Sequence, residues 1–192
     1  MTLGKLLIIG VICGAWPAAA LPVLALDPIG GALIGAPGDT RGWGFQLTND
    51  VGYLVITSAN YTAAATVGIF DPFIILPQNF AAVGPGETWS QTFNPSVQAG
   101  VAAYHINDFE IPGTVSSGVI ELTYDLFAVS PFDAAFDPSR DTISVGNILS
   151  TDASVTVGSP TAPVPEPRTA VLFLVAIALG VAHRAGGGRA GC

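Results

Sequence analysis

The chain has 192 residues, of which 50% are hydrophobic and only 10% are charged. Between residues 27 and 164, thirteen acidic residues stand against two bases, Arg41 and Arg140, which gives this region a formal charge of −11. So acidic a surface repels phosphate backbones and anionic lipid, and it excludes nucleic acid as a partner. The only cysteines are Cys13 and Cys192, so the region between them carries no disulfide and no thiol chemistry.

Residues 1–25 are predicted to be a secretory signal peptide. Lys5 supplies the positive start, residues 6–12 form an apolar stretch, and small residues follow. Two cleavage sites satisfy the need for small residues, one after Ala20 and one after Ala25. Signal peptidase is therefore an expected partner, and an uncleaved anchor is the alternative.

Residues 27–160 are predicted to form one domain of β-strands. Residues 27–39 are rich in Gly and Pro and are expected to be a lead-in loop. Residues 43–47 alternate aromatic or aliphatic with small or polar side chains, which predicts a half-buried strand. Residues 53–57 are β-branched and aromatic, and the Asn-Asp pair at 49–50 is interpreted as the turn of a hairpin.

Further strands are expected along the rest of this domain, separated by Gly, Pro, Asn and Asp. In the longest, Ile120, Leu122 and Tyr124 fall on one face of the strand. No helical period and no internal repeat is present. The expected fold class is all-β, a single β-sandwich domain of jelly-roll or Ig-like type, flanked by the N-terminal signal segment and a C-terminal transmembrane sorting helix. The further strands are predicted at residues 66–70, 73–76, 88–93, 100–106, 115–129, 143–148 and 153–157.

A Pro-rich linker, an uncharged apolar segment and a basic Gly-rich tail follow the domain. As a helix, about 14 apolar residues cover roughly 21 Å, somewhat less than the hydrocarbon core of about 30 Å. Basic residues beyond such a segment stay on the cytoplasmic side. We interpret the segment as transmembrane, and a permanent anchor or a buried apolar helix are the alternatives. The parts are the linker 161–168 with Val164, Pro165, Glu166 and Pro167, the segment 169–182, and the tail 183–192 with Arg184 and Arg189.

The Pro-Glu-Pro tripeptide, the apolar segment and the basic end together resemble the PEP-CTERM sorting signal. The resemblance implies that an exosortase-type enzyme recognises the tail in the membrane and cuts near the tripeptide. It also implies a Gram-negative bacterium that makes extracellular polysaccharide. The protein would pass through an inner-membrane intermediate to the cell surface or the extracellular matrix. Residues 42–50 and 121–127 also look like segments of PEP-CTERM proteins with β-sandwich bodies, to which the family attaches no settled activity.

The domain offers little for catalysis. His105 is its only histidine, it has no cysteine, and no serine stands in a Gly-x-Ser-x-Gly motif. We therefore expect no enzyme and interpret His105 as structural. Asp133, Asp137 and Asp141 recur every four residues in a Pro-containing stretch and are candidate Ca²⁺ ligands. Turn-forming aspartates in a solvated loop are the alternative, and no other cofactor is expected.

The aromatic side chains allow a second interpretation of the domain. Trp43, Tyr53, Tyr61, Trp89 and Tyr104 could line one face and stack on sugars, although aromatic residues on alternating strands commonly belong to the core. The expected function is an exported structural or adhesive protein of exopolysaccharide or biofilm. A carbohydrate-binding module is the first alternative, and an enzyme of unknown type is the second.

Overall fold

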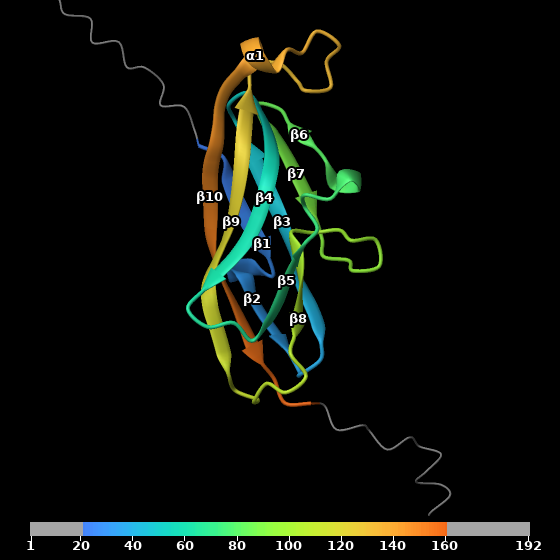
Figure 1. Ribbon diagram of the computed structural model, residues 1–192, viewed down its shortest axis with the longest axis vertical. Helices are drawn as coiled ribbons and strands as arrows, with labels where there is room; N and C mark the ends of the chain where they lie inside the picture. The colour runs from blue at the N-terminus through green and yellow to red at the C-terminus, as the bar shows by residue number, and fades with distance from the viewer. Residues whose placement is uncertain (1–20, 161–192) are drawn as a thin grey trace, which may run out of the picture. The chain divides into compact units, whose positions relative to one another are not determined.

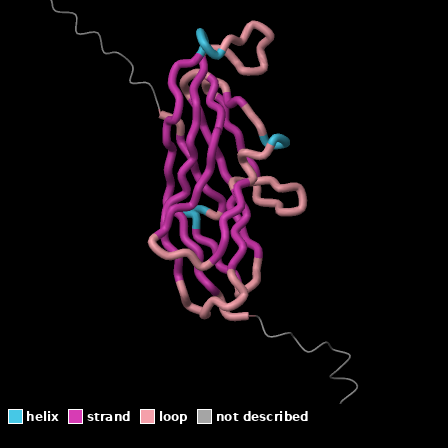
Figure 2. Tube along the Cα trace, in the orientation of Figure 1, coloured by secondary structure: helices cyan, strands magenta, loops and turns pink. Residues whose placement is uncertain are grey.

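The computed structural model describes residues 21–160, so the predicted leader up to residue 20 and the tail 161–192 lie outside it. The regular structure of the described chain is almost wholly β-strand, joined by turns and loops (Figures 1 and 2). The all-β class predicted from the sequence is therefore confirmed. The helical pieces of this part are a single α-helical turn, α1 (Pro138–Asp141), and two 3-10 turns, η1 (Ile29–Gly31) and η2 (Pro77–Asn79).

One sheet is organised around its long central strand, β3. Along one edge of β3, β1 pairs antiparallel from Val23 opposite Thr48 to Asp27 opposite Gly44. Along the other edge, β8 pairs with the first half of β3 and β7 with the second half, and β5 pairs with the far side of β8. The strands of this sheet are β1 (Val23–Asp27), β3 (Thr40–Asn49), β5 (Gly68–Pro72), β7 (Glu87–Gln91) and β8 (Ala102–Ile106).

The other sheet is organised around β9, which lies between β10 and β4 and is antiparallel to both. The short strand β2 pairs parallel with the end of β10, beginning with Ala32 opposite Ser154. An early strand and the last strand of the domain are thus neighbours. The strands of this sheet are β2 (Ala32–Gly35), β4 (Tyr53–Ala63), β6 (Ala82–Val83), β9 (Val115–Phe127) and β10 (Thr142–Val157).

Both sheets turn one face toward a single hydrophobic core. Successive side chains of a strand point to opposite faces, so a strand with one buried face alternates in burial. β1 shows this alternation, with Leu24 and Leu26 buried between exposed neighbours. β9 shows it as predicted, because Ile120, Leu122 and Tyr124 are all buried.

The expected hairpin between β3 and β4 is wrong, although both strands exist. β3 belongs to the first sheet and β4 to the second, so the chain crosses between sheets after Asn49. The side chain of Asn49 is fully buried at this crossing. Its Nδ2 donates to the carbonyl oxygens of Gly52 and Val83, both at 2.8 Å. Asn49 therefore stabilises the expected turn, since its Oδ1 accepts from the N–H of Val51 at 3.3 Å, and it also connects that turn to β6.

The folded domain begins earlier than the predicted boundary at residue 27. Val23–Asp27 is the strand β1, although the predicted signal peptide reaches residue 25. The expected lead-in loop 27–39 contains η1 and β2 instead. Gly30 and Gly31 have φ angles of 78° and 66°, a left-handed conformation that glycine adopts without a steric cost. These two glycines let the chain turn from the first sheet into the second.

Two other strand predictions also differ from the structure. Residues 73–76 form turns rather than a strand, since the backbone N–H groups of Phe73 and Ile74 both donate to the carbonyl of Val101. The two strands expected at 143–148 and 153–157 are one continuous strand, β10. Its register against β9 shifts twice near its start, as β-bulges produce.

Replacing Asn49 with Leu should destabilise the domain by about 1–3 kcal/mol, because two buried carbonyls lose their donor. The free energy of unfolding, measured by chemical denaturation, checks this. Asn60→Leu is the matched control, because Asn60 is an exposed residue of β4. An equal loss in both variants would show that the Asn49 contacts contribute nothing specific.

Candidate functional site

The predicted sorting residues cannot be placed in the structure. Val164, Pro165, Glu166 and Pro167, and the basic residues Arg184 and Arg189, all lie outside the described residues. The predicted transmembrane segment 169–182 lies there as well. Among residues 21–160, no helix is long and apolar enough to cross a membrane. The candidates that the structure can place are the three aspartates, His105 and the aromatic residues.

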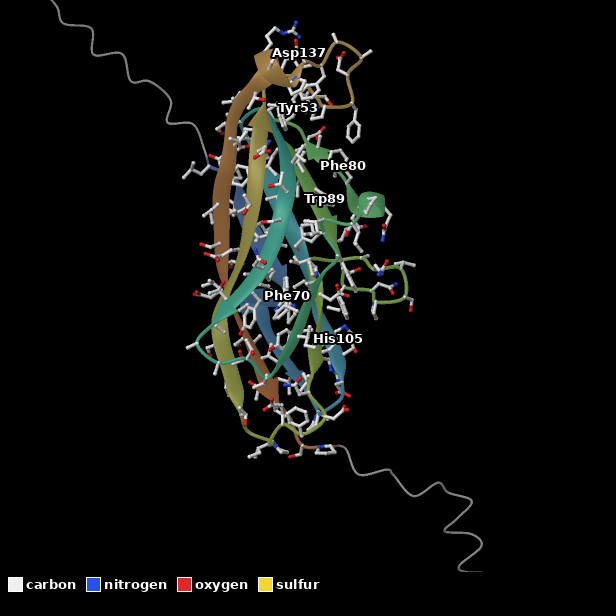
Figure 3. All side chains as sticks on the ribbon, in the orientation of Figure 1. Tyr53, Phe70, Phe80, Trp89, His105 and Asp137 are labelled. Carbon is white, nitrogen blue, oxygen red and sulfur yellow. The ribbon has the colours of Figure 1, made fainter. Side chains whose placement is uncertain are left out.

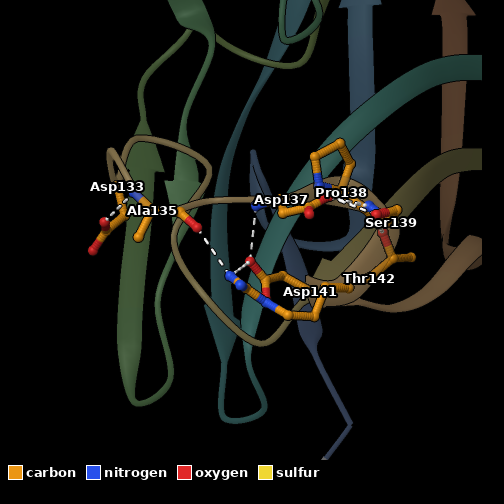
Figure 4. A network of polar contacts seen from close by, with 8 residues as sticks. Asp133, Ala135, Asp137, Pro138, Ser139, Asp141 and Thr142 are labelled. Atoms are coloured by element: carbon orange, nitrogen blue, oxygen red, sulfur yellow. Dashed lines mark hydrogen bonds and ion pairs between the residues drawn. The ribbon is translucent and has the colours of Figure 1, made fainter.

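Asp141 lies at the centre of a small polar network (Figure 4), and its element α1 lies at one end of the domain (Figure 1). Its carboxylate is buried. The guanidinium of Arg140 donates to both oxygens, from Nε to Oδ1 at 2.7 Å and from one terminal nitrogen to Oδ2 at 2.9 Å. The backbone N–H of Asp137 also donates to Oδ2, at 2.8 Å. Both carboxylate oxygens of Asp141 therefore accept hydrogen bonds from neighbouring residues.

The other two aspartates stabilise local turns. Asp137 is the N-cap of α1, and its Oδ1 accepts from the backbone N–H of Ser139 at 2.9 Å and from the hydroxyl of Ser139 at 2.7 Å. Asp133 accepts from the backbone N–H of Ala135 at 2.8 Å. The described residues contain no group of three His, Cys, Asp or Glu side chains placed to hold a metal ion. The structure therefore does not bring the three predicted Ca²⁺ ligands together.

The charge of Asp141 is stabilised by these contacts. The hydrogen bond from Arg140 is the main cause that lowers the pKa of Asp141 below its ordinary value, and the N–H of Asp137 adds to it. The backbone N–H of Ala36 likewise lowers the pKa of Asp39. From the sequence, Arg140 was counted only toward the net charge, and its pairing with its neighbour Asp141 was not predicted. The sequence did contain a signal for this pairing. Arg140 and Asp141 are adjacent, and they follow Asp137, a residue type that commonly caps the start of a helix.

His105 lies on β8 with its side chain exposed. Its Nδ1 is 2.9 Å from the hydroxyl oxygen of Thr40, its cross-strand partner on β3. Asp137 lies at the upper end of the view and His105 in the lower half (Figure 3). The structure therefore does not join the histidine to the aspartate cluster, and His105 has a local contact of the kind expected for a structural residue.

Trp43 occupies the middle of the core. It is fully buried, and its indole Nε1 donates to the carbonyl of Gly31 at 2.8 Å. The ring centroids of Tyr61 and Tyr104 each lie 5.8 Å from that of Trp43. The Tyr104 ring is also buried, and its hydroxyl accepts from the backbone N–H of Val67 at 3.2 Å. This burial raises the pKa of Tyr104.

The sugar-stacking face considered as an alternative is not formed, because Trp43 and Tyr104 are buried, while Tyr53, Tyr61 and Trp89 are half-buried. Trp43 and Tyr104 are closed inside the core, and Tyr61 meets Tyr104 edge-on, at an interplanar angle of 86°. Trp89 is half-buried and stands edge-on to Phe45, at 83°. Stacking on a sugar requires an open ring face, and the two fully buried rings have none. The alternative considered from the sequence, that these aromatics are core, is confirmed for Trp43 and Tyr104.

The surface of the described domain carries shallow clefts. One, of about 270 Å³, lies over β1, β3 and β7 and has Asp27 as its acidic lining residue; another, of about 380 Å³, lies beside β6 and β7 and has Glu87. Glu87 accepts from the backbone N–H of Gly84 at 2.7 Å. A single carboxylate in a cleft does not supply the pair of groups that acid–base hydrolysis requires.

Comparison with known proteins does not assign the chain to a family. No family model matches it, and no curated protein matches it. Solved structures that match include one described as WR4, an MSP family member of C. elegans, with 9% sequence identity and a TM-score of 0.33 over 70% of this chain and 97% of that chain. A similarity of this degree carries no argument about function.

Replacing Trp43 with Phe should cost about 1–3 kcal/mol of stability, because the buried carbonyl of Gly31 loses its donor and the ring becomes smaller. Thermal or chemical unfolding of the purified chain measures this loss. Trp89→Phe is the control, since Trp89 is only half-buried and packs at the edge of the core. The role assigned to the indole N–H fails if the two variants unfold alike.

Replacing Asp141 with Asn should make the domain less stable at neutral pH and less sensitive to acid. A carboxylate whose pKa is lowered in the folded state stabilises the fold above its unfolded pKa of about 3.9, and this contribution is lost as the pH falls through the lower folded value. Unfolding free energies between pH 7 and pH 3 check the sign. Parallel pH profiles for the two proteins would contradict it.

Proposed function

We propose that this chain is an exported protein of the cell surface or extracellular matrix, which is released through processing of its C-terminal tail. The observation that carries the proposal is the order of three features at the end of the chain: the tripeptide Pro165-Glu166-Pro167, an uncharged apolar segment, and a basic end with Arg184 and Arg189. An apolar segment that stops at arginines is held in the inner membrane. An exosortase-type enzyme would then find the tripeptide at the outer face of that membrane.

The end of the domain supports a removable tail. The backbone of Val157 closes onto the loop before β9, accepting from Gly113 at 2.7 Å and donating to Thr114 at 2.8 Å. The N–H of Gly158 donates to Gly35 at 2.7 Å. The described core is thus closed before the linker begins at residue 161. Cleavage near the tripeptide would remove no residue of that core.

The charge of the body supports a destination outside the cell, where a persistent surface charge keeps it soluble. Its two arginines are already paired, Arg41 with Asp39 and Arg140 with Asp141, each at less than 3 Å. Eleven of its thirteen acids therefore have no basic partner among the residues of the domain. We propose a structural or adhesive role in exopolysaccharide, on a sandwich of Ig-like or jelly-roll type, without a cofactor. The carbohydrate-binding and enzymatic alternatives gain no support from the buried rings or from the single carboxylates of the clefts.

Replacing Glu166 with Ala should leave a larger form of the protein in the membrane fraction, since the processing enzyme would lose the one charged residue of the tripeptide. Intact-mass analysis of envelope and medium from the native host measures both size and release. Asp152→Ala is the control, because Asp152 is an exposed acid on β10 and does not belong to the tripeptide. Unchanged size and release in the Glu166 variant would refute the proposed role of the tripeptide.

A further inference from the structure

We infer that signal peptidase cuts the bond between Ala20 and Leu21, so that the mature domain begins at Leu21. The inference rests on the proposed export of the chain, and it selects between two sites that the sequence leaves equal. Ala18 and Ala20 supply small residues at the recognition positions of one site, and Val23 and Ala25 supply them at the other.

The second site lies inside a strand of the folded domain. β1 pairs with β3 through five consecutive residues, and Ala25 is the middle one, opposite Gln46. On either side of it, Leu24 and Leu26 are only 8% and 6% exposed and belong to the common core. The Ala25–Leu26 bond is thus a link in the sheet and not part of a leader.

A cut after Ala25 would damage the domain in three ways. It would remove the pairs of Val23, Leu24 and Ala25 with β3 and leave only those of Leu26 and Asp27. It would take the buried side chain of Leu24 out of the core. It would also place a charged amino group on Leu26, whose side chain is buried, and a charge beside a core is costly to desolvate.

A cut after Ala20 leaves the described domain whole. Leu21 is 78% exposed and, with Pro22, precedes the first strand. Every residue of β1 and every described core residue is retained. Of the two cuts, only the one after Ala20 leaves a product that can form the five-residue pairing with β3, so the structure favours that site.

Two matched substitutions test the assignment in the full chain expressed in its native host. Ala20→Gln and Ala25→Gln each place a side chain too large for the position before a cleaved bond. Ala25 is exposed on β1, so the fold should accept Gln there. We expect wild type and Ala25→Gln to begin at Leu21, and Ala20→Gln to lose this cleavage and accumulate as precursor. N-terminal sequencing and intact mass measure both.

The outcomes separate this inference from the proposed function. A wild-type protein that begins at Leu26 overturns the assignment while the export proposal stands. A chain that keeps Met1 but has lost its C-terminal tail overturns the assignment in the same way. A full-length chain recovered from the cytosol overturns both.

Discussion

The buried hydrogen bond from the Trp43 indole to the carbonyl of Gly31 is the contact on which the two-sheet arrangement depends. Gly31 ends the turn through which the chain leaves β1 in one sheet and enters β2 in the other. Trp43 itself belongs to β3 and packs against Tyr61 of the opposite sheet. One side chain therefore fills the core and fixes the crossing that brings the start of the domain beside its last strand. A buried indole N–H or carbonyl without a partner would cost free energy. The position of the Gly31 turn therefore depends on the position of the Trp43 ring, and the reverse also holds.

The sequence predicts those strands whose signal is local, and it does not predict how they pair. Residues 43–47 and β9 were readable because side-chain types alternate along them, although the structure buries residues 42–45 without a break. The β3–β4 hairpin failed because Asn49, a common turn residue, is here a buried donor to Val83, which lies far along the chain. β1 was assigned to the leader because its leucines continue the apolar composition that precedes them. The pairing of β1 and the role of Asn49 both depend on residues that are distant in the sequence. A local sequence pattern does not contain this information.

The candidate sites also differ in whether local sequence is enough to predict them. The sorting motif is an order of residue types along the chain and could be read directly, although the structure does not describe it. The spacing of Asp133, Asp137 and Asp141 suggested one coordination shell, yet each carboxylate has a different backbone or guanidinium partner in its own part of the loop and of α1. The aromatic residues suggested a sugar-binding face, because a strand pattern cannot tell which face is covered by a second sheet. Burial of Trp43 and Tyr104 follows from the packing of both sheets.

The parallel pairing of β2 with β10 has a mechanical consequence. The described chain enters the domain in its upper part and leaves it at its lower end, and the strands run along this long axis (Figure 1). Tension applied between these points acts lengthwise on β10, across the direction of its hydrogen bonds to β9 and β2. The bonds of both ladders then share the load in shear instead of opening one after another from an end. A body of this geometry can transmit a pull between an attachment at one end and a contact at the other without unzipping.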